Sequence, residues 1–170
     1  AIGCGDKAGV LVVSRGSWIQ AVGTKTQPIV MTGVNDDHCV PPSYSTGTTP
    51  WKDKNNEKTS QWGGLIVLGN AKVTHSSAGP YNIEGLVATA ATEYGGTDDN
   101  DCSGELGYID IRYGGYQLEL SEEINGLTMG AVGRGTKIHN ISVTQNSDDG
   151  YEWFGGTVNT KYLVAWGVAD

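Results

Sequence analysis

Residues 63–70 read GGLIVLGN, a four-residue apolar strand between glycines that is closed by an asparagine. The same pattern, a short apolar strand ending in glycine or a small polar residue, returns three times. The later copies are GYIDIRYGG at residues 107–115, NISVTQN at 140–146 and KYLVAWG at 161–167. Recurring strands with small residues at their corners are typical of a chain wound into a parallel β-solenoid.

The spacing of these strands supports winding. Ile109 and Ile141 are 32 residues apart, and Ile141 and Tyr162 are 21 residues apart. Both values are close to the roughly 20–30 residues that one coil of such an array takes. Apolar and charged residues alternate along 109–113, which places one face inward and the other toward water. We therefore predict an all-β fold, a right-handed parallel β-helix of about five or six coils with long side loops.

The competing fold is an antiparallel sandwich, which also uses short strands and glycine turns. A two-residue hairpin signal occurs only at Asn125-Gly126, so we favour the parallel β-helix, with residues 1–170 as a single domain. The 26 glycines argue against a helical bundle, because each costs about 1 kcal/mol relative to alanine inside a helix. The chain begins at Ala1 without an initiator methionine or a leader, and we interpret it as a segment of a longer protein.

The charge and hydropathy of the chain limit its partners. The net charge is −8, and the basic residues are scattered, so binding to nucleic acid is not expected, because it needs a basic patch. No stretch of 18 apolar residues is present, so no membrane span is expected. Abundant Thr, Ser, Asn and Gly with few lysines suit a secreted protein or one on the extracellular cell surface.

Two polar stretches, 35–61 and 93–103, are expected to project from the body as loops because they offer few apolar residues to a core. In the first loop, Tyr44 and Trp51 lie among prolines. They are candidate contacts for a carbohydrate or a protein partner, since an exposed aromatic ring offers an apolar face to a sugar.

The three cysteines give an odd count. Cys39 and Cys102 both follow acidic runs in the polar loops, and in an oxidising compartment a disulfide between them would join the two loops. Cys4 would then be free, or would pair with residues outside this chain. A zinc site is a poor alternative, because the cysteines lack CxxC spacing and the three histidines fall in unrelated contexts.

The run QWGGLIVLGNA at residues 61–71 resembles a signature of a group of secreted bacterial proteins, common in Bacteroidetes and marine proteobacteria. Four further runs match in order: IEGL at 83–86, YGGTDDND at 94–101, EINGLTMG at 123–130 and DDGYEWFGGTVN at 148–159. The resemblance covers nearly the whole chain. It implies a right-handed parallel β-helix on the cell surface, in an adhesin-like protein or lipoprotein whose coils continue past the position of Asp170.

One cofactor is suggested by the acidic loop. Asp98, Asp99, Asp101 and the nearby Glu105 could together hold Ca²⁺, which takes six to eight oxygen ligands. The order of these residues lacks the glycine and the distal glutamate of an EF-hand loop, and a solvated acidic loop is the alternative.

Two other groups of charged residues are candidates for chemistry. Asp110 and Arg112 are outward positions of one predicted strand, and an acid–base dyad there could serve a polysaccharide lyase or a glycoside hydrolase. The alternative is a solvated ion pair that contributes under about 1 kcal/mol. For Asp148-Asp149 and Glu152, a corner that bonds local backbone amides is favoured over a calcium site, because a glycine follows the aspartates.

The leading hypothesis is a secreted or cell-surface structural and binding module. It would present the wall of the β-helix and its loops to a polysaccharide or to another protein. Residues 162–170 show no polar cap, so end-to-end self-association, or continuation into further coils, is also expected. Polysaccharide cleavage on the same scaffold is the alternative function.

Overall fold

The computed structural model describes residues 9–33, 36, 59–74, 79–117 and 124–169. These residues form eleven strands joined by turns, and no helix is found among them that could cross a membrane. The all-β prediction is therefore confirmed for this part of the chain. Tyr44, Trp51, Cys4 and Cys39 lie outside the described residues.

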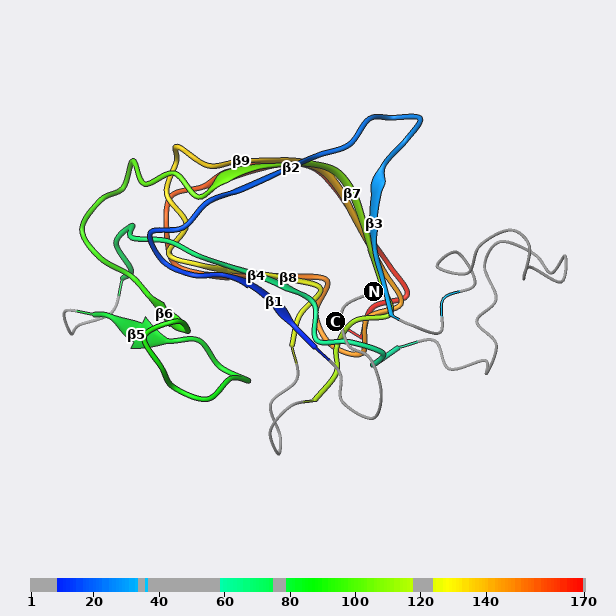
Figure 1. Ribbon diagram of the computed structural model, residues 1–170, viewed down its shortest axis with the longest axis horizontal. Helices are drawn as coiled ribbons and strands as arrows, with labels where there is room; N and C mark the ends of the chain where they lie inside the picture. Colours follow the sequence, from blue (N-terminus) through cyan, green and yellow to red (C-terminus); the bar gives the residue numbers. More distant parts are fainter. Residues whose placement is uncertain (1–8, 34–35, 37–58, 75–78, 118–123, 170) are drawn as a thin grey trace, which may run out of the picture.

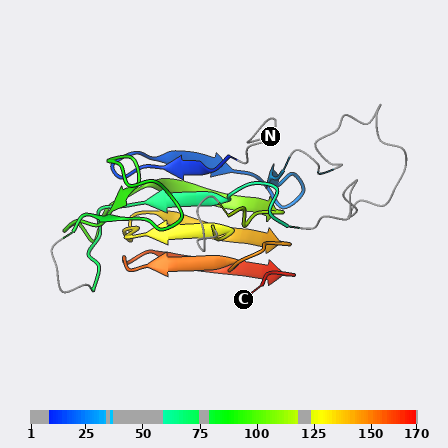
Figure 2. The same cartoon turned by 90° about the horizontal axis from the view of Figure 1, so that it is seen from below.

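Sheet A stacks four short parallel strands in the order β1-β4-β8-β10. Their bounds are β1 Leu11–Val13, β4 Leu65–Leu68, β8 Leu127–Gly130 and β10 Tyr151–Phe154. The register runs without slip, with Leu65 opposite Leu127 and Tyr151 opposite Leu127 on the other side. Figure 2 shows these strands one above another from the N-terminal to the C-terminal end of the stack.

Sheet B is also parallel throughout, in the order β11-β9-β7-β2, with β3 pairing β7 as well. Its strands are β2 Ile19–Val22, β3 Ile29–Met31, β7 Gly104–Arg112, β9 Lys137–Thr144 and β11 Asn159–Trp166. Because β2 pairs the first half of β7 and β3 the second half, β2 and β3 act as one strand interrupted by the turn at 23–28.

The chain passes through sheet A and then sheet B in every layer, which accounts for the superposed strands of Figure 1. An antiparallel sandwich is excluded for this part of the chain, since the one antiparallel pair of strands described is the small hairpin of β5 Tyr81–Asn82 and β6 Glu93–Tyr94. The described strands make four layers, and the predicted five or six coils are not reached there. Between β4 and β7, the β5–β6 hairpin forms a separate sheet instead of adding a layer to the stack.

Each long strand of sheet B bends at one residue in the left-handed backbone region. Tyr108, Asn140 and Tyr162 have φ of 51°, 53° and 59°. They occupy equivalent places, because Gly107 faces His139 and Ile109 faces Ile141 on the two sides of the bend. This conformation costs an L-residue about 1–2 kcal/mol, and the pairing on both sides of the bend offsets it. We call this column of residues the corner.

The interior between the two sheets is filled by apolar side chains that stack layer on layer. Leu106 pairs with Ile138 and Ile109 with Ile141, and all four side chains are fully buried. Polar residues of the same strands, such as Asp110 and Ser142, face outward. The core comprises Val13, Ala21, Trp62, Leu65, Val67, Leu106, Ile109, Ile111, Leu127, Met129, Val132, Ile138, Ile141 and Val143. Burial of such residues at about 25 cal/mol per Å² of apolar surface is the main stabilisation of the stack.

A second apolar cluster covers the opposite face of sheet A. Ile66 and Leu68 point away from the main core and pack beneath the β5–β6 hairpin, against Ile83 and Tyr94. All four positions of β4 are consequently buried, on both faces. Sheet B has no such cover along the middle of β7 and β9, where buried and half-buried residues alternate. The two outer faces of the stack therefore differ: sheet A is covered and sheet B is wet.

Candidate functional site

Outward-facing residues of sheet B fall into columns that run along the stack. Strand pleating sends alternate residues to opposite faces, and parallel pairing without slip puts equivalent residues side by side. Three such columns are Glu105–Lys137–Asn159, Gly107–His139–Lys161 and Asp110–Ser142–Val164. We call the part of this face around the corner, formed by Glu105, Tyr108, Asp110, His139, Asn140, Ser142 and Tyr162, the wall site.

His139 is held on the wall by two oxygen atoms. Its Nε2 lies 3.3 Å from Oε1 of Glu105, and its Nδ1 lies 3.0 Å from Oδ1 of Asn140. The pKa of Glu105 is lowered, chiefly by the hydrogen bond with His139 and further by the positive charge of Lys137, whose Nζ lies 3.6 Å away. Glu105 is therefore the anion of this part of the wall.

The ring of His139 occupies the space that a Cβ at position 107 would take. A Cβ at Gly107 would lie 2.6 Å from Cε1 of His139, closer than two carbon atoms can approach. The ring of Tyr108 meets the imidazole edge-on, with centroids 5.8 Å apart and planes at 85°. The imidazole thus lies over the backbone of β7 in a fixed orientation, with a carboxylate on one side and an aromatic ring on the other.

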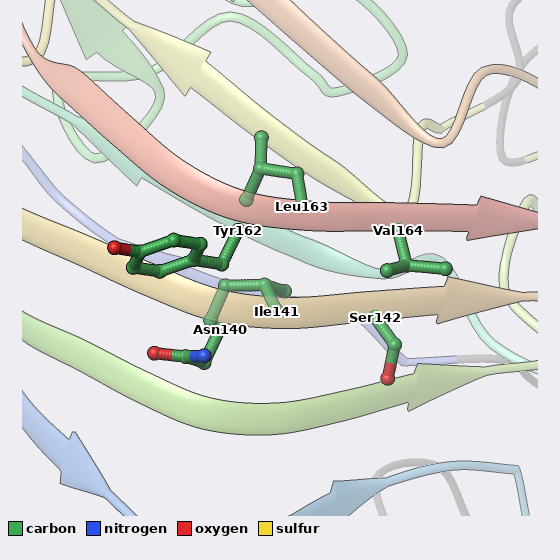
Figure 3. A pocket seen from close by; sticks show the side chains of 6 residues that line it. All are labelled: Asn140, Ile141, Ser142, Tyr162, Leu163 and Val164. Carbon is green, nitrogen blue, oxygen red and sulfur yellow. The ribbon is translucent and has the colours of Figure 1, made fainter.

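An open depression of about 470 Å³ lies beside this group, on β9 and β11 (Figure 3). Its lining consists of Asn140, Ile141, Ser142, Tyr162, Leu163 and Val164. Tyr162 is 73% exposed, and Figure 3 shows its ring next to the amide of Asn140 on the neighbouring strand. The depression therefore offers an amide, a hydroxyl and an exposed aromatic ring on a rigid surface.

The structure brings the two predicted catalytic residues together and buries one of them. Nε of Arg112 donates to Oδ2 of Asp110 at 2.6 Å, and Ser142 donates to the other oxygen of Asp110 at 2.8 Å. On its other side, Arg112 lies 3.6 Å from Asp36, which also accepts a hydrogen bond from Thr32. The side chains of Arg112, Asp110 and Asp36 are 9%, 16% and 3% exposed, so Arg112 lies in a largely buried ion-pair network and not in the solvated Asp110–Arg112 pair that was the alternative.

The position of Arg112 explains its burial. Asp36 lies in the segment after β3, and Trp62, in the segment before β4, donates its indole N–H to the carbonyl of Arg112 at 2.7 Å. Arg112 therefore joins the wall to both of these segments. Its guanidinium is committed to carboxylates inside the protein and has little surface to offer a substrate, whereas Asp110 keeps a half-buried edge on the wall.

The four acidic residues of the predicted calcium site turn to different partners. Asp98 accepts from the backbone N–H of Asn100 at 2.9 Å. The pKa of Asp99 is lowered, first by the hydrogen bond from the backbone N–H of Lys72 and also by the Lys72 side chain. Asp101 accepts from Asn70 at 3.0 Å. Glu105 belongs to the wall site, where it contacts His139.

These contacts tie the 98–101 loop to the stack. Among the residues that the structure describes, no group of three or more His, Cys, Asp or Glu side chains is arranged to hold a metal ion. Calcium binding at this loop therefore stays a prediction. Cys102 is an exposed free thiol at the end of the same loop. Its predicted disulfide partner, Cys39, lies outside the described residues, so that pairing also stays a prediction.

Sequence reasoning missed the chemistry of Glu152. Burial raises its pKa to about 7, and the negative charges of Glu84, Asp149 and Asp148 act in the same direction. Its carboxyl accepts a hydrogen bond from the buried amide of Asn125. Glu152 faces Thr128 in the pairing of β10 with β8, on the covered face of sheet A. Alternation along β10 puts Glu152 on the outer face of sheet A and Trp153 on the inner face. Only the tertiary structure shows that this outer face is partly shielded from water.

A family model described as a pectate-lyase like beta helix domain matches residues 49–170, which include the wall site and the covered face of sheet A. Neither the curated proteins nor the solved structures give a match.

We expect Arg112→Met to lower the free energy of unfolding by about 3–5 kcal/mol, because removal of one partner leaves buried carboxylates uncompensated. Chemical denaturation measures this value. Adding Asp36→Asn and Asp110→Asn should restore part of it. As a control, Lys72→Met breaks the exposed pair with Asp99 and should cost less than about 1 kcal/mol. A loss for Arg112→Met no larger than that of the control would contradict the buried network.

Glu152 should make the protein less stable as the pH rises from about 4.5 to about 7. In this window the folded state holds a proton that the unfolded state releases, since the folded pKa of about 7 exceeds the ordinary 4.5, so unfolding becomes easier with rising pH. The contribution of protonated Glu152 to the free energy of unfolding is complete below about pH 4.5 and is lost as the pH rises through about 7. Glu152→Gln keeps an acceptor for Asn125 and should remove this part of the pH dependence. Parallel curves for the two proteins in denaturation across pH 4–8 would refute the assignment.

Proposed function

The chain belongs to the family of pectate-lyase-like β-helix domains, and we propose that it is a glycan-binding module whose binding surface is the wall site. The observation that carries this proposal is the open depression at the corner, lined by Asn140, Ser142 and Tyr162. It lies next to two anions that are already oriented, Glu105 through His139 and Asp110 through Arg112.

The chemistry of the wall site matches that of a sugar. Sugar hydroxyls both donate and accept hydrogen bonds, so they pair with amides, hydroxyls and carboxylates of the kind present here. The apolar face of a pyranose ring suits an exposed aromatic ring such as Tyr162. Because the side chains project from paired strands, little conformational entropy is lost on binding. An open depression that follows the columns of a stack favours an extended chain over a small enclosed ligand.

The charge of the protein favours neutral or amino-containing glycans over acidic ones. A net charge of −8 repels polyanions, and long-range potentials of this sign lower their local concentration. A polyuronate would need a bridging cation such as Ca²⁺ at the acidic loop. Uncharged polysaccharides need no such ion.

The finer architecture belongs to the same proposal. Right-handed winding is the hand of nearly all parallel crossover connections, and a secreted or cell-surface location accords with the resemblance of the 61–71 run to secreted bacterial β-helix proteins. Tyr44 and Trp51 in the 35–61 loop would add aromatic contacts to the same ligand. A protein partner in place of a glycan would use the same surface.

Polysaccharide cleavage is the second candidate function, and the His139–Glu105 pair favours it. A histidine held by a carboxylate on an accessible surface can accept a proton from a bound substrate. In that case Glu105 would orient the ring through Nε2–H, and the substrate would take the place of Asn140 at Nδ1, the nitrogen that accepts the proton. Asp110 would bind the substrate alongside. The family description as pectate-lyase like supports testing an acidic polysaccharide for this activity.

We expect binding to neutral glycans on an array, with Tyr162→Ala and Glu105→Gln each weakening it by about tenfold, the value of one stacked ring or one charge-assisted hydrogen bond. The control Trp18→Ala removes a ring of similar exposure, 69%, outside the wall site and should bind normally. Tyr44→Ala combined with Trp51→Ala tests the loop and leaves Asp36 in its ion pair with Arg112. Release of reducing ends or unsaturated sugars that depends on His139 would establish cleavage, and absence of any glycan binding would refute the proposal.

We further propose that copies associate end to end through the outermost strands. Within the described residues, β10 and β11 pair on one side only, and Trp153, Tyr162, Val164 and Trp166 on them are exposed. Open strand edges of this kind recruit further strands. Sedimentation velocity should show larger species as the concentration rises, and Val164→Lys should reduce them. A single monomeric species at high concentration would contradict this proposal.

A further inference from the structure

A second polar group lies on the covered face of sheet A, away from the wall site. Thr128 is 2% exposed, and its hydroxyl has no hydrogen-bond partner among the described residues. A buried hydroxyl without a hydrogen-bond partner destabilises the fold by about 1–3 kcal/mol, so this position is a candidate for a functional role. The neighbouring residues of β8, Leu127 and Met129, point into the main core. The alternation of the strand therefore directs Thr128 outward, beneath the β5–β6 hairpin.

Carboxylates gather at this place. Glu152 faces Thr128 in register across β8 and β10, so their side chains lie on the same face. Asn125, also buried, donates its amide hydrogen to Glu152. Glu84 of the hairpin segment acts on Glu152 through its negative charge, and Asp149 and Asp148 do so from the preceding turn. The charged groups that act on Glu152 from both elements packed against it are thus all acidic.

A row of three aromatic rings borders the carboxylates. Tyr81 and Tyr94 pair across the hairpin with ring centroids 5.8 Å apart, and Tyr94 lies 5.9 Å from Phe154. Tyr94 rests on Gly130, where a Cβ would lie 2.8 Å from its Cγ. Gly130 and Phe154 form the register pair two residues along from Thr128 and Glu152. Burial is the main cause of the raised pKa of Tyr94, and the negative charges of Glu84 and Glu152 raise this pKa further.

We propose that Glu84, Glu152, Tyr81, Tyr94 and Phe154, with Thr128 and Asn125 beneath them, form a binding site for a primary ammonium group. Carboxylates and aromatic faces both attract an organic cation. The unpartnered hydroxyl of Thr128 decides between kinds of cation, because it can accept a hydrogen bond from an N–H of a primary ammonium and has nothing to accept from a quaternary one.

The site differs from the wall site in position and in ligand. It lies on sheet A, whereas the wall site lies on sheet B (Figure 1). It is therefore independent of the proposed glycan binding, and either can fail without the other. An inorganic divalent ion is disfavoured, since no group of three or more ligating side chains is found among the described residues, whereas a single ammonium needs only one or two acceptors and a ring.

The test is a ¹H–¹⁵N NMR titration at pH 8 with butylammonium chloride, and with butanol as the neutral molecule of the same shape. We expect shifts at the side-chain amide of Asn125 and at the backbone amides of Thr128 and Glu152 with butylammonium only. Glu152→Gln keeps the shape of the side chain and should weaken binding by at least about tenfold, the value of one charge-assisted contact. Thr128→Val should weaken it by about threefold while remaining folded, since it removes only the hydroxyl.

Asp98→Asn is the matched control, because it also removes one negative charge but lies in the loop after β6 and bonds to Asn100. Its affinity should equal that of the unaltered protein. Four results would overturn the proposal: equal shifts with butanol, equal affinity in both Glu152→Gln and Thr128→Val, equal affinity for tetramethylammonium, or tighter binding of Ca²⁺ at the same amides. Should Glu152→Gln not fold, Thr128→Val alone decides the case.

Discussion

Parallel pairing without slip between successive layers is the constraint on which the rest of the structure depends. Ile109 faces Ile141 and Ile141 faces Leu163, and the same holds for every pair along β7, β9 and β11. A slip of one residue would turn each apolar column outward and each polar column inward. The register therefore determines at once which side chains make the core and which form columns on the outside.

The bends of the chain follow from the same constraint. The strands β7, β9 and β11 each contain one residue with positive φ at the equivalent register position, so the corner forms a column as regular as the columns of the core. Where the first layer needs the same bend, it uses Gly23 and a short turn, because a Cβ at that position would lie 2.8 Å from the carbonyl oxygen of Tyr108. Regular corners give the wall its rigid surface, and the excursions between strands can vary in length without disturbing the stack.

The two outer faces of the stack have different chemistry because only one of them is covered. On sheet B, water reaches the polar columns, and its charges are paired with one another across neighbouring strands, as Glu105 is with His139 and Lys137. On sheet A, Thr128 is buried and Glu152 is partly shielded from water. A carboxyl in that position holds its proton to about pH 7, and a hydroxyl stays without a partner. The cover, more than the residue types, makes this face chemically distinct.

The parallel, all-β character of the chain could be read from the sequence alone. Alternation along 109–113 and the recurrence of short apolar strands are local, and a strand with one apolar face has few ways to bury it. The number of layers could not be read, because the sequence does not say whether a polar stretch such as 69–103 adds a layer or leaves the stack. The placing of Asp110 beside Arg112 followed from strand period, but the burial of Arg112 depends on Asp36, which is distant in the sequence.

Local pattern thus determined the strands, their inward faces and the fold class. Tertiary structure alone decided which outward residues stay wet, which meet across layers and which lose their water. His139 illustrates the difference: nothing beside it in the sequence suggests a site, and its partner Glu105 is brought to it by the next layer. The physical reason is that hydrogen bonds and pKa shifts depend on distance and solvent exclusion. Both arise only when separate parts of the chain come together.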